Sequence, residues 1–272
     1  MEFGSAQEGE GMRVIREPAI YLVGRQTVDA SAVYRFLQDH ETAWATETEH
    51  GAEALAEMAG RVCYMSFGAK QGRKSNTEYM ANIIDSGHGS VLEHAVWNFI
   101  IAGVSRSFTH ELIRHRAGWG YSQLSQRYVD ESTAGFVEPD VIAADPQAHR
   151  LWLESVEASH KAYGALVERL SQVVEERYPE LSRTSKRKMA RQAARSVLPN
   201  ATETKIFVTA NARALRHFVE LRGSSAAEPE IRKVAVKLLE IMQQEAPNIF
   251  GDMALVALDD GSMGVQVSHH KV

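Results

Sequence analysis

Apolar positions recur at helical spacing through most of this chain, a pattern that predicts a helix-rich protein. The predicted helices cover residues 30–39, 52–65, 79–86, 105–116, 147–176, 185–197, 212–222 and 228–244. Helix-capping residues support two of the starts, because Asn76-Thr77-Glu78 precedes one helix and Asn211 precedes another. Tyr178-Pro179 and Pro199 end the helices before them, since proline cannot continue a helix.

Short β-rich runs lie between these helices. Residues 18–24, 94–103 and 204–209 are predicted to be strands. No internal repeat or low-complexity linker divides the chain, so we expect one helix-rich α+β domain with a small central sheet over residues 12–272. Residues 1–5 (MEFGS) resemble a cloning scar, and residues 1–11 are expected to be this scar and a flexible N-terminus.

Composition and charge narrow the class of protein. The 272 residues are 44% hydrophobic and carry a formal charge of −5, which is typical of a globular protein and argues against a general nucleic-acid binder. No apolar run reaches the ~18 residues of a membrane span and no secretory leader is recognised, so we expect no membrane association and a cytoplasmic location. Cys63 is the single cysteine, and its apolar helical surroundings predict a buried, inert thiol.

The densest group of polar side chains is Arg114-His115-Arg116, followed by the run from Tyr121 to Tyr128. At a helix end, three consecutive side chains point about 100° apart, so one ligand on one face cannot collect all three. The loop that follows has glycines at 118 and 120 and several short hydrogen-bond donors, a composition that suits an anion site. The alternative is a solvated, charged helix terminus.

A second basic group lies on the predicted helix 212–222. Arg213 and His217 are about 40° apart around this helix, whereas Arg213 and Arg222 are about 180° apart. The helix could therefore serve a different ligand on each face. The alternative is a set of surface cations on an amphipathic helix.

Histidines and glutamates also invite a metal hypothesis, which the spacing does not support. His110-Glu111 begins like the zinc-helix motif, but Arg114 stands where the second histidine is needed. We therefore expect no metal site. Glu93 and His94, just before a predicted strand, are interpreted as a hydrogen-bonded core pair.

Taken together, these motifs resemble the flavin-dependent thymidylate synthases. The family signature is an Arg-His-Arg triplet, a spacer and then Ser-x-Arg-Tyr, which here is RHRAGWGYSQLSQRY from Arg114 to Tyr128. The resemblance extends through GHGSVLEH, RSVLP, NARALRHFVELR and EIR, and in order and spacing it covers roughly residues 55 to 250. A motif of this length with these companions is specific.

The resemblance implies methylation of C5 of the uracil ring of a nucleotide monophosphate, dUMP to dTMP. FAD would be the cofactor, and methylenetetrahydrofolate and NADPH the co-substrates. The family also implies a homotetramer whose sites are shared between chains. Arg222 would lie beside the pyrimidine and favour ionisation at N3, which makes it the expected catalytic residue.

The family's binding residues can be carried over one by one. Those that would line the flavin are His88, Ser90, Arg114, His115, Arg116, Asn211, Arg213 and His217. Those that would hold the nucleotide are Glu111, Arg114, Gln123, Ser125, Gln126, Arg127, Arg195 and Arg222, with Ser125 and Arg127 at its phosphate.

Several departures from the family pattern leave the nucleotide open. The spacer is one residue longer than in many members, and Glu111 replaces a glutamine. Gln123 and Gln192 stand where some members have glutamate, and residues 226–228 (Ala-Ala-Glu) replace His-Ala-Gln. One alternative is UMP as substrate, as in nucleoside-antibiotic pathways, with Glu111 accepting a hydrogen bond from the 2′-hydroxyl. Others are a catalytically silent flavin- or nucleotide-binding protein and a metal hydrolase.

Overall fold

A computed structural model of the chain describes residues 12–270, so the expectations for residues 1–11 lie outside the described residues. The chain forms two compact units. Unit 1 contains residues 12–17, 103–107 and 123–205, and unit 2 contains residues 18–102, 108–122 and 206–270. Because the chain passes repeatedly from one unit to the other, neither unit is one continuous segment. The single domain expected from residue 12 onwards stays a prediction.

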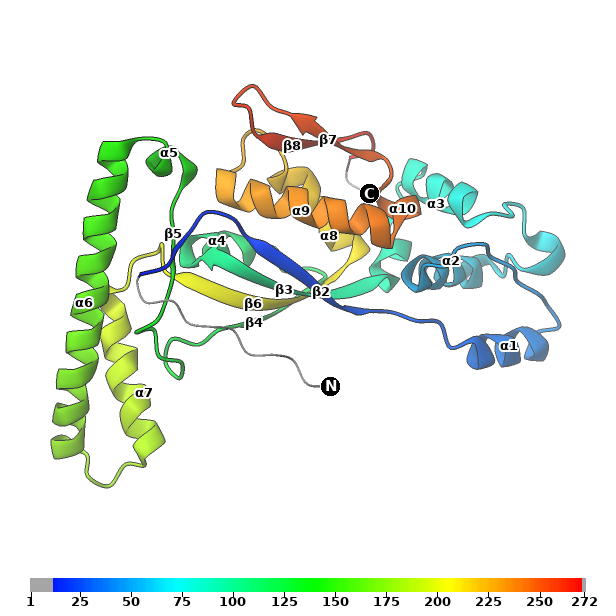
Figure 1. Cartoon of the computed structure of the whole chain (residues 1–272). Helices are drawn as coiled ribbons and strands as arrows, with labels where there is room; N and C mark the ends of the chain where they lie inside the picture. Colours follow the sequence, from blue (N-terminus) through cyan, green and yellow to red (C-terminus); the bar gives the residue numbers. More distant parts are fainter. Residues whose placement is uncertain (1–11, 271–272) are drawn as a thin grey trace. The chain divides into compact units, whose positions relative to one another are not determined.

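A four-stranded sheet, most of whose residues belong to unit 2, supports the helices of that unit. Its strands follow the order β2-β3-β6-β4, with β2 at Ala19–Arg25, β3 at Val96–Ser105, β6 at Glu203–Asn211 and β4 at Trp119–Gln123 (Figure 1). Strands β2 and β3 are antiparallel. Every second residue of β3 is buried, including Trp97 and Phe99, as the period of a strand with one buried face requires.

Two helices of unit 2, α8 (Ala212–Arg222) and α9 (Pro229–Glu245), pack against each other on one face of this sheet (Figure 1). Leu215 and Phe218 of α8 and Leu239 of α9 are fully buried. The other elements of the unit are α1 (Ala30–Asp39), α2 (Gly51–Tyr64), α3 (Asn76–Asp85), α10 (Pro247–Phe250), the 3₁₀ turns Gly68–Lys70 and Gly89–His94, and the hairpin β7 (Met253–Ala257) and β8 (Met263–Val267). Most of α4 (Arg106–Leu112) also belongs to unit 2, although its first two residues belong to unit 1.

Unit 1 is built around a helical hairpin, α6 (Pro146–Arg177) and α7 (Arg183–Ala194), which Figure 1 shows side by side. Asp145 caps the first of these helices and Ser182 the second, each through its side-chain oxygen. The unit also contains α5 (Asp140–Ala143), the 3₁₀ turn Arg195–Val197, and a parallel pair of short strands, β1 (Val14–Ile15) and β5 (Phe136–Val137). No helix among residues 12–270 is long and apolar enough to cross a membrane.

The helix-rich α+β class and most predicted elements are confirmed. Asn211 caps α8 as predicted, because its Oδ1 accepts from the backbone N–H of Ala214 at 2.9 Å. Two boundaries are wrong by a few residues. Ser75, rather than the following residues, caps α3, and a 3₁₀ turn occupies 89–94 so that the strand begins only at Val96. Strand β4 and the β7–β8 hairpin were not predicted.

The prediction of a helix over 105–116 is wrong at both ends. Strand β3 continues to Ser105, and α4 ends at Leu112, so Arg114, His115 and Arg116 follow the helix instead of belonging to it. The chain turns here because the Tyr121 hydroxyl lies 3.0 Å from the carbonyl oxygen of Leu112 and 2.7 Å from that of His115. The helical argument about three diverging side chains therefore does not apply to this triplet.

Two burial predictions are also wrong. Cys63 is exposed because it lies in the last turn of α2, where residues 62–65 are all exposed, although Ala52, Ala56 and Gly60 earlier in the helix are buried. Glu93 and His94 are exposed as well, and they do not form a core pair. In each case the residue lies at the exposed end of a short apolar segment.

Candidate functional site

Helix α8 carries basic side chains at both ends, and its fold determines which way they point. The helix buries Leu215, Phe218 and Val219 against the core, which leaves Arg213 and His217 exposed near its start. Arg222 lies in the last turn, where a cation interacts favourably with the helix dipole. The two arginines consequently have different surroundings.

Arg222 is held from two sides. Its Nε donates to Nε2 of His115 at 3.1 Å, and its Nη1 donates to Oε2 of Glu111 at 2.9 Å. The Arg222 side chain is 21% exposed and that of Glu111 is 36% exposed. Among residues 12–270, the hydrogen bonds of Arg222 use only these two nitrogens, so Nη2 remains for a ligand.

His115 is buried, and its pKa explains how it can accept from a cation. The ring packs edge-on against Phe218 at 5.1 Å and lies 6.1 Å from the Trp119 ring. Burial, and then the positive charge of Arg222, lower the pKa of His115 from 6.5 to about 4. The imidazole is therefore neutral at pH 7 and carries its proton on Nδ1, so that Nε2 can accept from Arg222.

A second carboxyl group joins this cluster. Partial burial of the carboxyl group, a hydrogen bond with Glu111 and the negative charge of Glu111 raise the pKa of Glu228 to about 7, although the residue as a whole is exposed. Glu228 was not among the site residues predicted from the sequence.

The residues assigned to the flavin lie in unit 2, and several come from elements in contact. Arg213 donates to Glu93 at 2.6 Å, and this ion pair joins α8 to the 3₁₀ turn 89–94. His88 and Ser90, at the start of this turn, are both exposed. The first turn of α8 and the 3₁₀ turn thus present polar side chains together.

The remaining flavin assignments surround the loop after the Arg-His-Arg triplet. Asn211 packs against Gly118, where a Cβ atom would lie 2.7 Å from the Asn211 side chain and φ is +75°. Glycine is therefore required at 118, and Asn211 has a structural role as helix cap and loop contact. Arg114 and Arg116 are exposed, and Arg114 donates to the His110 carbonyl at 3.3 Å.

The other nucleotide residues, Gln123, Ser125, Gln126, Arg127 and Arg195, lie in unit 1. The Ser125 carbonyl accepts from the backbone N–H groups of Tyr128 at 3.1 Å and Val129 at 2.9 Å, which forms a tight turn. Gln126 is buried, and the Arg127 guanidinium lies 5.7 Å from the Tyr128 ring centroid. These backbone bonds fix the course of the chain from 125 to 129.

Arg106 is a basic residue of unit 1 that the sequence reasoning missed. Burial of Arg106 lowers the pKa of its guanidinium, and the nearby positive charge of Arg195 lowers this pKa further. The negative charge of Glu131 acts in the opposite direction. Arg106, Glu131 and Arg195 therefore lie near one another. Glu131 is itself buried, and its Oε1 has no hydrogen-bond partner among the described residues. A cation directly after the buried strand β3 was the available signal. Two neighbouring arginines make a suitable set of donors for a phosphate.

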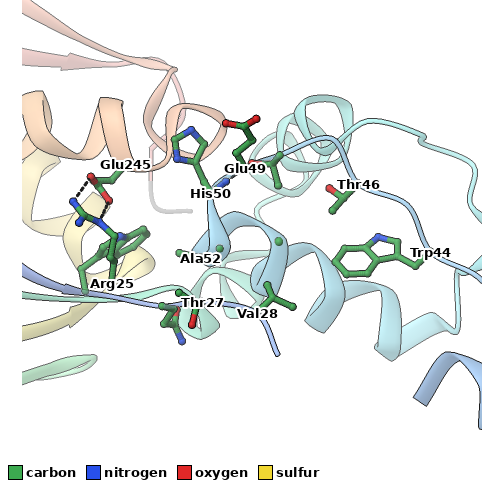
Figure 2. A pocket seen from close by; sticks show the side chains of 14 residues that line it. Arg25, Thr27, Val28, Trp44, Thr46, Glu49, His50, Ala52 and Glu245 are labelled. Atoms are coloured by element: carbon green, nitrogen blue, oxygen red, sulfur yellow. Dashed lines mark hydrogen bonds and ion pairs between the residues drawn. The ribbon is translucent and has the colours of Figure 1, made fainter. Parts of the chain in front are cut away.

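A large cavity of about 570 Å³ lies elsewhere in unit 2 (Figure 2). It is lined by Trp44, Trp97 and His50, and by the ion pair between Arg25 and Glu245, whose Nη2 and Oε1 lie 2.7 Å apart. None of the residues predicted for the flavin or the nucleotide lines it.

Within residues 12–270, no group of three or more His, Cys, Asp and Glu side chains is arranged to hold a metal ion. The clustered side chains instead combine arginines, neutral histidine and hydrogen-bonding groups. Such a set recognises anions and polarised carbonyl groups rather than divalent cations.

The comparisons with known proteins agree with this chemistry. Residues 46–248 match the family model described as thymidylate synthase complementing protein. A flavin-dependent thymidylate synthase of Mycolicibacterium gilvum is 47% identical over 236 residues, which cover 86% of this chain and 92% of that protein. One of Corynebacterium efficiens is 44% identical over 237 residues, covering 87% and 93%.

The fold is shared with a solved structure. The UMP/dUMP methylase PolB from Streptomyces cacaoi, bound with 5-Br UMP, superimposes with a TM-score of 0.60 at 20% identity, covering 89% of this chain and 96% of that chain. The family model and the two relatives, which are 44% and 47% identical over most of their length, show to which family the chain belongs. This chain belongs to the flavin-dependent thymidylate synthase family.

Proposed function

We propose that this methyltransferase catalyses the flavin-dependent reductive methylation of C5 of a uracil nucleotide monophosphate, with dUMP to dTMP as its reaction. Methylenetetrahydrofolate would supply the carbon, and NADPH the reducing equivalents. The observation that carries the proposal is Arg222, fixed between neutral His115 and Glu111 with Nη2 left over. The names of the relatives, flavin-dependent thymidylate synthases, support the same reaction.

Arg222 would act on the pyrimidine ring. When N3 loses its proton, negative charge spreads to the two carbonyl oxygens of the uracil, and a guanidinium beside one of them stabilises this charge. Because His115 and Glu111 already hold the side chain, Arg222 does not need to reorganise when the charge develops. The resulting electron density at C5 makes this carbon the nucleophile.

The polar residues of unit 2 fit a flavin. The assigned set contains exposed arginines and histidines, which suit the negatively charged pyrophosphate of FAD. Bound FAD would supply the reducing equivalent and take part in moving the methylene carbon. His88, Ser90, Arg114, Arg116, Arg213 and His217 are the residues proposed to bind and orient it.

The nucleotide phosphate is assigned to unit 1. Arg127 and Arg195 would donate to its oxygens, together with Ser125. We add Arg106 to this set because of its proximity to Arg195. The homotetramer with sites shared between chains, and the cytoplasmic location, remain part of the proposal. Sedimentation of the flavin-loaded protein as a tetramer would support the first of these.

A second substrate, UMP, is favoured by one specific observation. Glu111 stands at the pyrimidine arginine as a carboxylate, which can only accept hydrogen bonds, and the 2′-hydroxyl of UMP is a donor. The fold relative PolB is a methylase named for both UMP and dUMP. The test is kcat/KM for each nucleotide in the natural protein and in Glu111→Gln. A UMP preference that survives Glu111→Gln would remove this role of Glu111.

The experiment that tests the main proposal is a product analysis. The protein is incubated with FAD, NADPH, methylenetetrahydrofolate and either dUMP or UMP, and the nucleotide is analysed by mass. A methylated nucleotide is expected. A protein that binds flavin, and whose flavin NADPH reduces, but that leaves both nucleotides unchanged would instead be a catalytically silent binder.

A further inference from the structure

A short loop connects α8 to α9, and its first residue directly follows Arg222. This loop, residues 223–228, contains the positions at which the chain departs from the family pattern after Arg222. Gly223 ends α8, and its N–H donates to the Val219 carbonyl at 2.8 Å. The last turn of a helix lacks part of its hydrogen bonds, so it opens more easily than the middle. The orientation of Arg222 therefore depends on what holds this loop.

The β7–β8 hairpin packs directly against the start of the loop. The Val265 N–H donates to the Gly223 carbonyl at 2.8 Å. A Cβ atom at Gly223 would lie 2.5 Å from Cγ2 of Val265, so a larger residue does not fit between α8 and the hairpin. Figure 1 shows the hairpin beside α8 and α9. It lies outside residues 46–248, the part of the chain that matches the family model.

Arg232 joins the same loop to the hairpin from the side of α9. It is the arginine of the EIR motif, and its side chain is only 5% exposed. Its Nη1 donates to the Ser225 carbonyl at 3.2 Å, and its Nη2 donates to Oδ2 of Asp260 at 2.8 Å. Asp260 lies in the turn between β7 and β8. One buried guanidinium thus bridges the loop and the hairpin.

The hairpin is itself anchored to both helices, so it can hold the loop in place. Nη1 and Nη2 of Arg216, on α8, donate to the two carboxylate oxygens of Asp252, directly before β7. Nε2 of Gln243, on α9, donates to the Met253 carbonyl at 2.7 Å. The bridge therefore ends on an element that is fixed independently of the loop.

We propose that Arg232 is a positioning residue for Arg222: its bridge from the loop to the hairpin holds the last turn of α8. This inference rests on the proposed function for the task of Arg222, though not for the contacts that orient it. A buried ion pair often stabilises a fold no more than apolar side chains of similar volume do. An arginine at this buried position is explained by its two contacts, which an apolar side chain could not make.

The expected consequence of losing the bridge is poorer orientation of Arg222. If the last turn of α8 opens, the guanidinium leaves His115 and Glu111 for part of the time. The charge that develops on the uracil ring then has no partner in place, and a misplacement of about 1 Å can cost about 10²-fold in rate. The loss should appear mainly in kcat, because the proposed phosphate contacts of unit 1 stay intact.

Arg232→Met tests this, because methionine fills much of the same volume but cannot form the bridge. It leaves no charge unpaired in the interior, since the side chain of Asp260 is 55% exposed and stays solvated. We expect kcat for methylation to fall about 10- to 100-fold, with little change in the KM of the nucleotide or the Kd of the flavin. Arg25→Met is the matched control, since it removes the pair with Glu245 at the other end of α9. It should keep the natural kcat.

Asp260 provides a second pair of variants that leaves the interior unchanged. Asp260→Ala removes the hairpin end of the bridge and should lower kcat by a smaller factor, since the bond to Ser225 remains. Asp260→Asn keeps an acceptor for Arg232 and should retain most of the natural kcat. Natural kcat values in both Arg232→Met and Asp260→Ala would overturn the proposal.

The double variant Arg222→Ala/Arg232→Met shows whether Arg232 acts through Arg222. If it does, adding Arg232→Met should leave the kcat/KM of Arg222→Ala nearly unchanged, because changes within one chain of contacts are not additive. A further loss as large as that caused by Arg232→Met alone would overturn the proposal. Arg232 would then support the fold or another group instead.

Hydrogen–deuterium exchange of the flavin-loaded protein without nucleotide separates this inference from the proposed function. The amides of residues 219–228 should exchange faster in Arg232→Met than in the natural protein or in Arg25→Met. If neither dUMP nor UMP is methylated but this difference is present, the proposed function fails and the hold of Arg232 on the end of α8 stands. If exchange in this segment is the same in all three proteins, the inference is wrong.

Discussion

The two ends of α8 carry the same residue type in different environments. Arg213 pairs with Glu93 on the surface, where both side chains are 48% exposed. Arg222 is 21% exposed and is bonded to the buried, neutral His115 and to Glu111. An exposed pair is worth about 0–1 kcal/mol, so a ligand can open it at little cost. A ligand can therefore break the ion pair of Arg213 and bind this arginine, whereas Arg222 is already held in a fixed orientation.

Replacing the positioned arginine should have the strongest effect. Arg222→Ala should lower kcat/KM for methylation by about 10²-fold or more, because it removes the charge beside the ionising ring. Flavin binding should largely persist, since His115 is the one residue assigned to the flavin that Arg222 contacts among residues 12–270. Steady-state kinetics and flavin fluorescence measure the two effects. Near-normal turnover in this variant would remove Arg222 from the mechanism.

A smaller effect is expected at the proposed phosphate site of unit 1. Arg127→Ala should weaken nucleotide binding by about 1.5–3 kcal/mol, the value of a charged hydrogen bond. The change should appear mainly in KM, with kcat less affected. Arg150→Ala, which removes an exposed arginine from α6 in the same unit, is the control. An unchanged KM in Arg127→Ala would show that Arg127 does not bind the phosphate.

His115 should make stability depend on pH on the acid side. Its pKa falls from 6.5 in the unfolded chain to about 4 in the folded one, so the folded state binds the proton less readily. Stability is then lost as the pH falls below 6.5, by about 2 kcal/mol at pH 5. Urea unfolding at fixed protein and flavin concentrations should show this loss, and His115→Asn should reduce it.

Glu228 changes the free energy of unfolding in the opposite direction, on the alkaline side of the same urea-unfolding experiment. The raised pKa of Glu228 means that stability is lost as the pH rises towards and through 7.

His110→Gln, which changes an exposed histidine, serves as the control for His115→Asn. If both variants lost stability equally between pH 6.5 and 5, burial of His115 would not be the cause.

The weakest effect is expected at the exposed end of α8. Glu93→Gln breaks the ion pair with Arg213 and should change the free energy of unfolding by less than about 1 kcal/mol. If Arg213 binds the flavin, freeing it from Glu93 should leave flavin affinity equal or somewhat higher. A marked loss of flavin in Glu93→Gln would mean that Glu93 orients Arg213, and the contrast between the two arginines would weaken.

The sequence could predict α8, its cap and the different faces of Arg213 and Arg222, because these follow from local rules. Asn211 is a strong capping residue, and helical geometry fixes the angle between residues nine apart at about 180°. The helix-rich α+β class followed in the same way from hydrophobic spacing.

The contact of Arg222 with His115 could not be predicted, since it depends on a chain reversal after α4. That reversal depends on the Tyr121 hydroxyl meeting two carbonyl groups and on Gly118 fitting against Asn211. Local patterns also misplaced Cys63, because periodicity locates a helix but does not show that its last turn lies beyond the packed core. Glu228 was noticed only as a departure from a family pattern.

The transfer of the methylene carbon, and the part of Arg222 in it, can be followed with an isotopic label. Reduced, flavin-loaded protein is mixed with dUMP and labelled methylenetetrahydrofolate for a single turnover, and the nucleotide is analysed by mass. We expect labelled dTMP from the natural protein and about 10²-fold less, or none, from Arg222→Ala. Flavin reoxidation without any label in either dUMP or UMP, or equal labelling by Arg222→Ala, would contradict the proposed reaction and the role of this arginine.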